Sequence, residues 1–185
     1  SSTGHMILAE QVLKFSFSSE FMEMFRVVIQ LGAILAVVVL YFKKLWPFCA
    51  DNGRDSGFSR HFRWPVVRLW CKIIVACVPA AVLGLLLDDW LDAHLYNSIT
   101  VALMLIIYGI AFILIERRPR VPTTTKLSRI TYKQALIVGA WQVLALIPGT
   151  SRSGSTIIGG LLCGMSRPAA SQFTFFLAIP AMALD

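Results

Sequence analysis

A short polar segment, residues 148–156, carries the residue types in this chain that are best suited to chemistry. It reads PGTSRSGST and lies between two apolar runs. Pro148 is expected to end the helix before it, and the glycines allow a tight turn. A second helix can begin after the turn, with Ser153 or Ser155 as its cap. The N–H groups of that helix start, the hydroxyls and the Arg152 guanidinium together predict a phosphate site.

The alternative is a Gly/Ser-rich kink between two membrane helices, in which Arg152 only caps carbonyl groups. An arginine in the membrane interior is costly and usually has a function, which favours the phosphate site.

Composition indicates what surrounds this segment. Of 185 residues, 57% are hydrophobic and 15% are charged, and the apolar residues form long blocks. Soluble domains have about 45–50% hydrophobic and about 25% charged residues. The composition therefore predicts an integral membrane protein. The net charge of +7 fits basic cytoplasmic loops, and nucleic-acid binding is not expected because the chain has no basic soluble module with interleaved aromatic residues. The four cysteines have no CxxC spacing, so they indicate neither a zinc site nor a disulfide framework.

Three apolar segments are long enough to cross a bilayer, which takes about 20 residues. They are residues 24–42, 69–87 and 99–115, and a shorter apolar stretch at 6–15 could form a half-helix. Basic residues distinguish the connecting segments: seven Lys and Arg lie in 43–72, six in 116–133 and none in 88–98. Because basic loops stay in the cytoplasm, the first two segments are predicted to be cytoplasmic and the third external.

A weak internal repeat is also visible. Residues 4–9 align with 154–159, and residues 25–32 align with 173–180. Three crossings between the copies would give them opposite orientations, which is the inverted-repeat plan of many transporters. Each copy would bring a polar turn into the membrane, and the two turns should face each other across a cavity.

The predicted fold is therefore an all-α integral membrane protein, a polytopic helical bundle with re-entrant half-helices and an inverted-topology repeat. It forms one membrane domain over residues 1–185, with a first repeat portion at 1–42, a cytoplasmic loop at 43–65, connecting spans and a basic loop at 66–133, and a second repeat portion at 134–185.

A histidine would complete the site if the two turns meet. In that case Ser1, Ser2, Thr3 and His5 lie opposite Ser151, Arg152, Ser153, Ser155 and Thr156. His5 could then serve as general acid, base or nucleophile near neutral pH, and Arg152 would neutralise the charge that develops in phosphoryl transfer. The alternative is that His5 is inert.

Three motifs resemble a known family. SSTGH at residues 1–5, FRVVIQLGAILAV at 25–37 and PGTSRSG at 148–154 closely resemble the undecaprenyl-pyrophosphate phosphatases of the BacA/UppP type, in register over essentially the whole chain. The resemblance implies an enzyme that removes the terminal phosphate of undecaprenyl pyrophosphate on the outer side of the bacterial plasma membrane. This activity recycles the lipid carrier for peptidoglycan, and overproduction goes with bacitracin resistance. The resemblance also implies re-entrant helix pairs, an inverted repeat and a divalent cation, Mg²⁺ or Ca²⁺.

Individual roles follow from the same resemblance. The family's essential histidine falls on His5, its essential arginine on Arg152, and a nucleophile sometimes proposed for it on Ser2. The phosphate-binding groups would be Ser1, Thr3, Ser151, Ser153, Gly154, Ser155 and Thr156. The family's acidic segment precedes SSTGH, so the metal ligands are expected before residue 1, and residue 1 is expected to lie inside a longer protein. Arg26 stands where the family commonly has a glutamate.

Other classes match the sequence less well. A type-2 phosphatidic-acid phosphatase needs a histidine where Ile158 stands, and a P-loop needs a lysine where Ser155 stands. A lipid-phosphate transporter or flippase is the main alternative, because alternating access uses an inverted repeat with a midplane site. A kinked bundle without a site ranks third. The expected partners are undecaprenyl pyrophosphate and membrane lipids, and the sequence leaves the oligomeric state open.

Overall fold

The structure is a computed structural model, and it describes residues 19–47, 63–95, 97–117 and 121–183. Ser1, Ser2, Thr3, His5 and the half-helix predicted at 6–15 lie outside the described residues. Within the described ranges every regular element is a helix, apart from one isolated β-bridge between Thr124 and Met165. The all-helical prediction is confirmed for this part of the chain.

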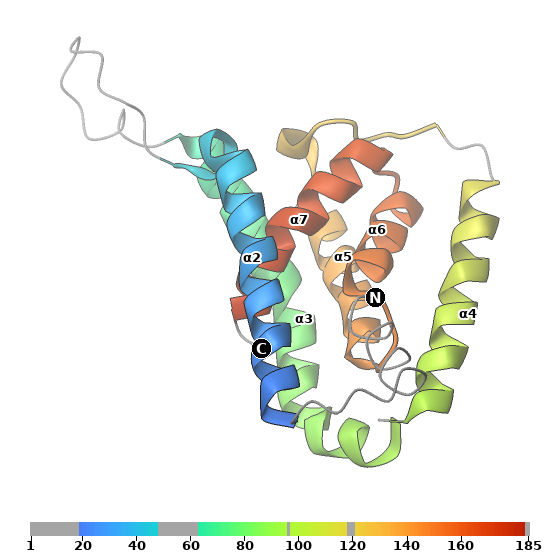
Figure 1. Cartoon of the computed structure of the whole chain (residues 1–185). Helices are drawn as coiled ribbons and strands as arrows, with labels where there is room; N and C mark the ends of the chain where they lie inside the picture. Colours follow the sequence, from blue (N-terminus) through green and yellow to red (C-terminus); the bar gives the residue numbers. More distant parts are fainter. Residues whose placement is uncertain (1–18, 48–62, 96, 118–120, 184–185) are drawn as a thin grey trace, which may run out of the picture.

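Three helices are long and apolar enough to cross a membrane. They are α2 (Ser19–Leu45), α3 (Trp64–Leu95) and α4 (Ser98–Glu116), and they contain the three predicted crossings. The helices run beyond the predicted ends because the backbone stays helical through polar flanks: Lys43 and Lys44 lie in the last turn of α2. Pro79 lies inside α3. The prediction of a membrane protein is therefore confirmed (Figure 1).

The remaining helices are shorter. They are the 3₁₀ turn η2 (Leu127–Arg129), α5 (Tyr132–Val143), the 3₁₀ turn η3 (Leu144–Leu146), α6 (Arg152–Leu162) and α7 (Arg167–Ala183). In Figure 1, α5 and α6 lie between α3 and α4, and α7 runs across α3 toward α2. With 12 and 11 residues, α5 and α6 are about 18 and 16 Å long. Each covers roughly half of the hydrocarbon core, which is about 30 Å thick.

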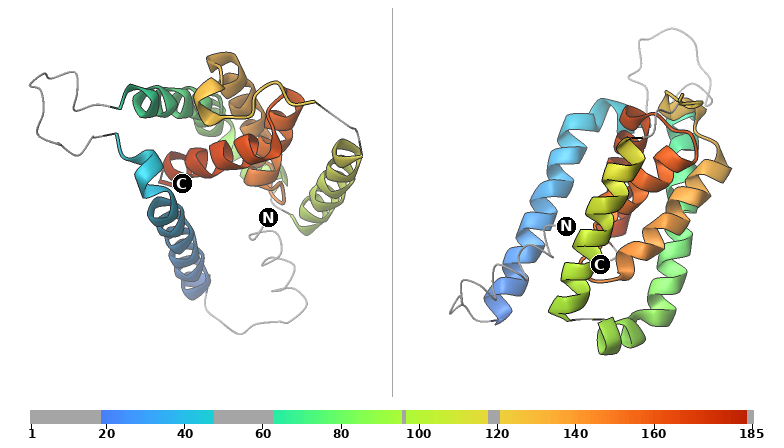
Figure 2. Two further views of the ribbon diagram at one scale, coloured as in Figure 1. Left: turned by 90° about the horizontal axis from the view of Figure 1, so that it is seen from above. Right: turned by 90° about the vertical axis from the view of Figure 1, so that its right-hand side faces the viewer.

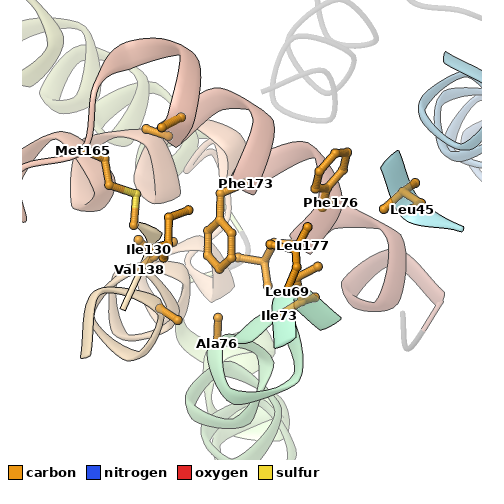
Figure 3. Close-up of a cluster of buried hydrophobic side chains, with 13 residues drawn as sticks. Leu45, Leu69, Ile73, Ala76, Ile130, Val138, Met165, Phe173, Phe176 and Leu177 are labelled. Atoms are coloured by element: carbon orange, nitrogen blue, oxygen red, sulfur yellow. The ribbon is translucent and has the colours of Figure 1, made fainter. Parts of the chain in front are cut away.

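The core is formed where α7 crosses α3 and α5 (Figure 3). Phe173 and Phe176 of α7 are fully buried, and Ile73 and Ala76 of α3 are fully buried beside them. Ridges of apolar side chains thus hold α3, α5 and α7 together. On the α2 side, Tyr41 meets the Phe176 ring edge-on at 5.2 Å between centroids.

Large apolar side chains cover the outward faces of α2 and α4. Val39 and Leu40 are 73% and 78% exposed, and in α4 only Val101 and Tyr108 are buried. Both helices lie at the edge of the bundle in the left view of Figure 2. An apolar outer surface of this kind fits a lipid environment, where it carries no hydrophobic penalty.

Glycine allows α5 to pack closely against α3. A Cβ added at Gly139 would lie 2.2 Å from the backbone oxygen of Ala76. The two helices stay close further along the chain. Leu146, seven residues after Gly139, packs beside Gly84, which lies eight residues after Ala76. The close contact is the kind that small residues provide between membrane helices.

A glutamine joins the basic segment 121–131 to the hairpin of α5 and α6. Gln134 is buried, and its Nε2 donates to Thr124 Oγ1 and to the Cys163 carbonyl, both at 3.1 Å. Its Oε1 accepts from the backbone N–H of Thr131 at 3.0 Å, while Thr131 Oγ1 accepts from the Gln134 N–H. This reciprocal capping box starts α5.

Replacing Gln134 by leucine is expected to lower thermal stability in detergent. The change leaves buried polar partners without their bonds, at a cost of about 2 kcal/mol, which corresponds to a fall of about 4–8 °C in the unfolding midpoint. The exposed neighbour gives a matched control, since Lys133→Leu removes no hydrogen bond of this junction. Equal midpoints for the two variants would contradict this account.

Candidate functional site

The polar segment forms a tight turn between η3 and α6. The last helical residue before it is Leu146, two residues before Pro148, as expected for a helix that proline ends. The Thr150 N–H donates to the Ile147 carbonyl at 3.1 Å. Gly149 has φ +88°, and a Cβ there would lie 2.6 Å from the Cα of Val101 in α4. Only glycine fits this position without strain or collision.

The cap of α6 differs from the prediction. Ser153 or Ser155 was the expected N-cap, but the N-cap is Ser151, whose extended backbone precedes α6 and whose Oγ accepts from the Gly154 N–H at 3.2 Å. The turn at Gly149 supplies the physical reason. It reverses the chain early enough for the helix to begin at Arg152, so the two later serines fall inside the first turn.

This cap determines which groups face an anion at the helix start. The Ser155 N–H donates to the Ser151 carbonyl at 2.8 Å, and the Gly154 N–H is used by the cap. The exposed Ser153 lies before both, at a position whose N–H has no intrahelical acceptor. Its hydroxyl lies 3.3 Å from that of Ser151. Two hydroxyls, a backbone N–H and the positive end of the helix dipole therefore lie together.

Arg152 is the first residue of α6, and it adds a full positive charge at this point. Its Nη1 atom is buried. A guanidinium held at a helix start can bind two oxygens of one phosphate.

Ser155 and Thr156 lie on the buried side of α6. Ser155 is fully buried and its Oγ donates to Tyr108 Oη at 2.7 Å. Thr156 Oγ1 donates to the Arg152 and Ser153 carbonyls at 3.0 and 3.1 Å, and it accepts from Thr174 Oγ1 at 3.0 Å. These hydroxyls anchor α6 to α4 and α7.

Two polar residues beside the turn, Gln142 and Thr150, were not predicted from the sequence to belong to the site. Gln142 and Thr150 are each 6% exposed, and the Gln142 Oε1 and Thr150 Oγ1 atoms are buried without a hydrogen-bond partner among the residues that the structure describes. Such atoms are costly and require explanation. The sequence could have indicated Gln142, because it is the only side chain with an amide or a charge in the apolar run 135–147.

The described residues do not fit a divalent-cation site. No group of three or more His, Cys, Asp or Glu side chains lies together in the part of the chain that the structure describes. The buried oxygens of Gln142 and Thr150 are neutral, and the positively charged Arg152 lies beside the same turn. Mg²⁺ and Ca²⁺ prefer carboxylate oxygens. No chemical step is therefore assigned to a metal at these residues.

A cavity of about 820 Å³ lies at the other end of α6. Its lining includes Glu116, Leu162 and Arg167, and Arg167 forms an ion pair with Glu116 across it. None of the predicted site residues that the structure describes is among the residues lining this cavity. The polar turn lies at the start of α6, and the cavity lies at its end.

Fold and site together define a polytopic, all-helical membrane protein in which two half-length helices meet at a polar, arginine-bearing turn. The chain belongs to the family described as Bacitracin resistance protein BacA, whose sequence model matches residues 1–185. This membership confirms the resemblance drawn from the three sequence motifs.

Curated relatives in several bacteria are similar over nearly the whole chain. An undecaprenyl-diphosphatase of Enterococcus faecalis is 59% identical over 98% of this chain and 64% of its own length. Relatives of the same name in Streptococcus thermophilus and Desulfitobacterium hafniense are 53% and 56% identical over 98% of this chain, and over 62% and 64% of their own lengths. The chain thus spans somewhat less than two thirds of the relatives that it matches.

Proposed function

We propose that this chain belongs to an enzyme that hydrolyses undecaprenyl pyrophosphate to undecaprenyl phosphate and phosphate, recycling the lipid carrier for cell-wall synthesis. The observation that supports the proposal is the start of α6 in a lipid-facing bundle, where the Ser151 cap, Arg152 and the Ser153 N–H lie together and offer the kinds of donor that bind phosphate. The name of the relatives, undecaprenyl-diphosphatase, supports the same substrate.

The proposed site lies between the two halves of an inverted repeat. Half-length α5 and α6 support a re-entrant pair whose turn lies within the membrane. The counterpart turn of the first repeat would bring Ser1, Ser2, Thr3 and His5 to the opposite side of the phosphate. Irregular backbone at that depth is tolerated only where it lines a polar cavity, which is what a pyrophosphate group would occupy.

The site is proposed to open toward the outer side of the bacterial plasma membrane. Gly149 packs on Val101, which lies one turn from the beginning of α4. That end of α4 follows segment 88–98, which has no Lys or Arg, whereas the basic segments lie at the opposite end of the bundle. The positive-inside rule therefore supports an external turn.

The proposed reaction breaks one P–O bond. Arg152, Ser151 and the Ser153 N–H bind the terminal phosphate and stabilise its charge as the bond to the bridging oxygen breaks. An oxygen of water or of Ser2, or a ring nitrogen of His5, forms the new bond to phosphorus. Where Ser2 or His5 attacks, water then hydrolyses the phosphorylated side chain, which releases phosphate and regenerates the residue. With an oxygen nucleophile, His5 can take up its proton. Undecaprenyl phosphate leaves with the bridging oxygen.

Two further elements belong to the proposal. Ser155 and Thr156 act by holding α6 in place, because their hydroxyls already bond to Tyr108 and to backbone carbonyls. A divalent cation, Mg²⁺ or Ca²⁺, would supply charge neutralisation on the pyrophosphate oxygens. Its protein ligands are not among the described residues.

The test is phosphate release from undecaprenyl pyrophosphate by the whole protein in detergent, with and without EDTA. Release is expected to need the cation and to fall at least about 100-fold in His5→Ala and Arg152→Ala. Circular dichroism of each variant checks that it is folded. Folded wild-type protein that releases no phosphate would refute the proposal, and transbilayer movement of the lipid without hydrolysis would indicate a transporter.

A further inference from the structure

One face of α4 contacts the polar turn and the first turn of α6. Val101, Tyr108 and Phe112 have the spacing i, i+7 and i+11, which places them along a single stripe of a helix. Val101 packs against Gly149, Tyr108 bonds to Ser155, and a Cβ at Gly154 would lie 3.1 Å from the Phe112 ring. The lipid-facing helix α4 is therefore in direct contact with the segment that carries Arg152.

Two buried hydroxyls form a polar contact along this stripe. Ser155 is fully buried, Tyr108 is 8% exposed, and the Ser155 Oγ donates to the Tyr108 Oη at 2.7 Å. The two residues are 47 positions apart in the chain. In apolar surroundings such a bond is strong, and a buried hydroxyl left without its partner is costly.

Ser155 lies in the first turn of α6 and is bonded to the residue that caps this helix. Its N–H donates to the Ser151 carbonyl, and Ser151 is the residue that caps α6. A serine hydroxyl that loses its partner inside a helix can bond back to the carbonyl four residues earlier, which bends the helix. For Ser155 that carbonyl belongs to Ser151, so the bend would fall at Arg152.

We propose that Tyr108 is a positioning residue of the phosphate site: by accepting the hydrogen bond of the Ser155 hydroxyl, it prevents that hydroxyl from bonding to the Ser151 carbonyl and fixes the position of the first turn of α6. The direction of the Arg152 side chain and of the Ser153 N–H then depends on a tyrosine of the lipid-facing helix. This role rests on the proposed phosphatase function. It also gives the phosphate site a physical connection to the helix that borders the lipid.

Tyr108→Phe keeps the ring and removes the acceptor, so it tests the proposal directly. In the whole protein, kcat for phosphate release is expected to fall about 10-fold with little change in KM, since a small misplacement of a catalytic group is costly. Tyr132→Phe removes a hydroxyl from an exposed tyrosine at the start of α5 and serves as the matched control.

Adding a second change separates positioning from direct contact with the substrate. Ser155→Ala removes the hydroxyl that would bond back, so the double variant Tyr108→Phe/Ser155→Ala is expected to recover to within about 3-fold of the wild-type kcat. A double variant as slow as Tyr108→Phe would mean that Tyr108 touches the substrate, and a still slower one would mean independent roles. Either result overturns the proposal.

Amide hydrogen exchange gives a readout that does not depend on turnover. Exchange at the N–H of Ser155 is expected to be faster in Tyr108→Phe than in wild-type protein, and to slow again in the double variant. If wild-type protein releases no phosphate, the proposed function fails whatever the exchange shows. If it is active and Tyr108→Phe changes neither kcat nor exchange, the role of Tyr108 alone is refuted.

Discussion

Replacing Arg152 by lysine is expected to lower kcat/KM for undecaprenyl pyrophosphate by about 100-fold, the usual cost of losing a donor to developing negative charge. Arginine offers a rigid planar fork that binds two phosphate oxygens, whereas lysine offers a single, strongly hydrated point charge. The Arg152 Nη1 atom is already buried, so a lysine at this position would have to bury an ammonium group. Initial rates of phosphate release over a range of substrate concentrations would measure the change.

The neighbouring helix provides a matched control for this change. Arg167 also stands at the first position of its helix, but its side chain is 65% exposed and it pairs with Glu116 at the other end of α6. Exposed ion pairs contribute little to stability. Arg167→Lys is therefore expected to keep nearly full activity. Equal losses in the two variants, or no loss in Arg152→Lys, would show that Arg152 does not bind the reacting phosphate.

Gly139→Ala is expected to destabilise the bundle by about 1–3 kcal/mol, the usual cost of overpacking. The added Cβ would lie 2.2 Å from the backbone oxygen of Ala76, and a backbone atom cannot rotate away as a side chain can. Helices α5 and α3 must then separate, which shifts η3 and the turn that follows it. Thermal unfolding in detergent, followed by tryptophan fluorescence, would report the loss, and phosphate release should fall with it.

Replacing a different glycine by alanine should have the opposite effect on the stability of the bundle. Gly109 lies in α4 with no atom within 4 Å of an added Cβ. In a helix, alanine is more favourable than glycine by roughly 0.5–1 kcal/mol, so Gly109→Ala should be neutral or stabilising. Similar destabilisation at both positions would mean that the close contact of Gly139 with Ala76 does not limit the packing.

The long helices were predictable from sequence, because an apolar run of membrane length has few other stable environments. Their ends were less predictable, since the helix continues through Lys43 and Lys44 and through the first turn of α3 at Trp64. A long cationic side chain can reach the interface from a helical backbone. Hydrophobicity marks the lipid boundary, which need not be the end of the helix.

The cap of α6 could not be chosen from sequence. Ser151, Ser153 and Ser155 are equally good capping residues. The choice depends on the turn at Gly149, and this turn is set by its contact with Val101, 48 residues earlier in the chain. The Tyr108–Ser155 bond is also long-range, because its partners are 47 positions apart in the chain. Local sequence patterns do not predict contacts between residues that lie this far apart in the chain.

The residues of the first turn remain predictions. His5 and the serines beside it lie outside the described residues, so their place opposite Arg152 rests on the repeat and on the family motifs. The arginine half of the site is different, because the structure places Arg152 at a capped helix start. The prediction of a turn followed by a helix is therefore confirmed, whereas the cap was assigned from residue type alone and was wrong.

The bonds of Gln134 also bear on the order in which the protein is assembled during synthesis. The capping box with Thr131 is local, so α5 can start as soon as its own residues have been made. The bond to the Cys163 carbonyl joins residues 29 positions apart, and Thr123 bonds to the Gly164 carbonyl across 41 positions. Contacts this distant form only after the intervening chain exists. Segment 121–131 must therefore wait for α6 to be completed, and the closure of the hairpin is a late event.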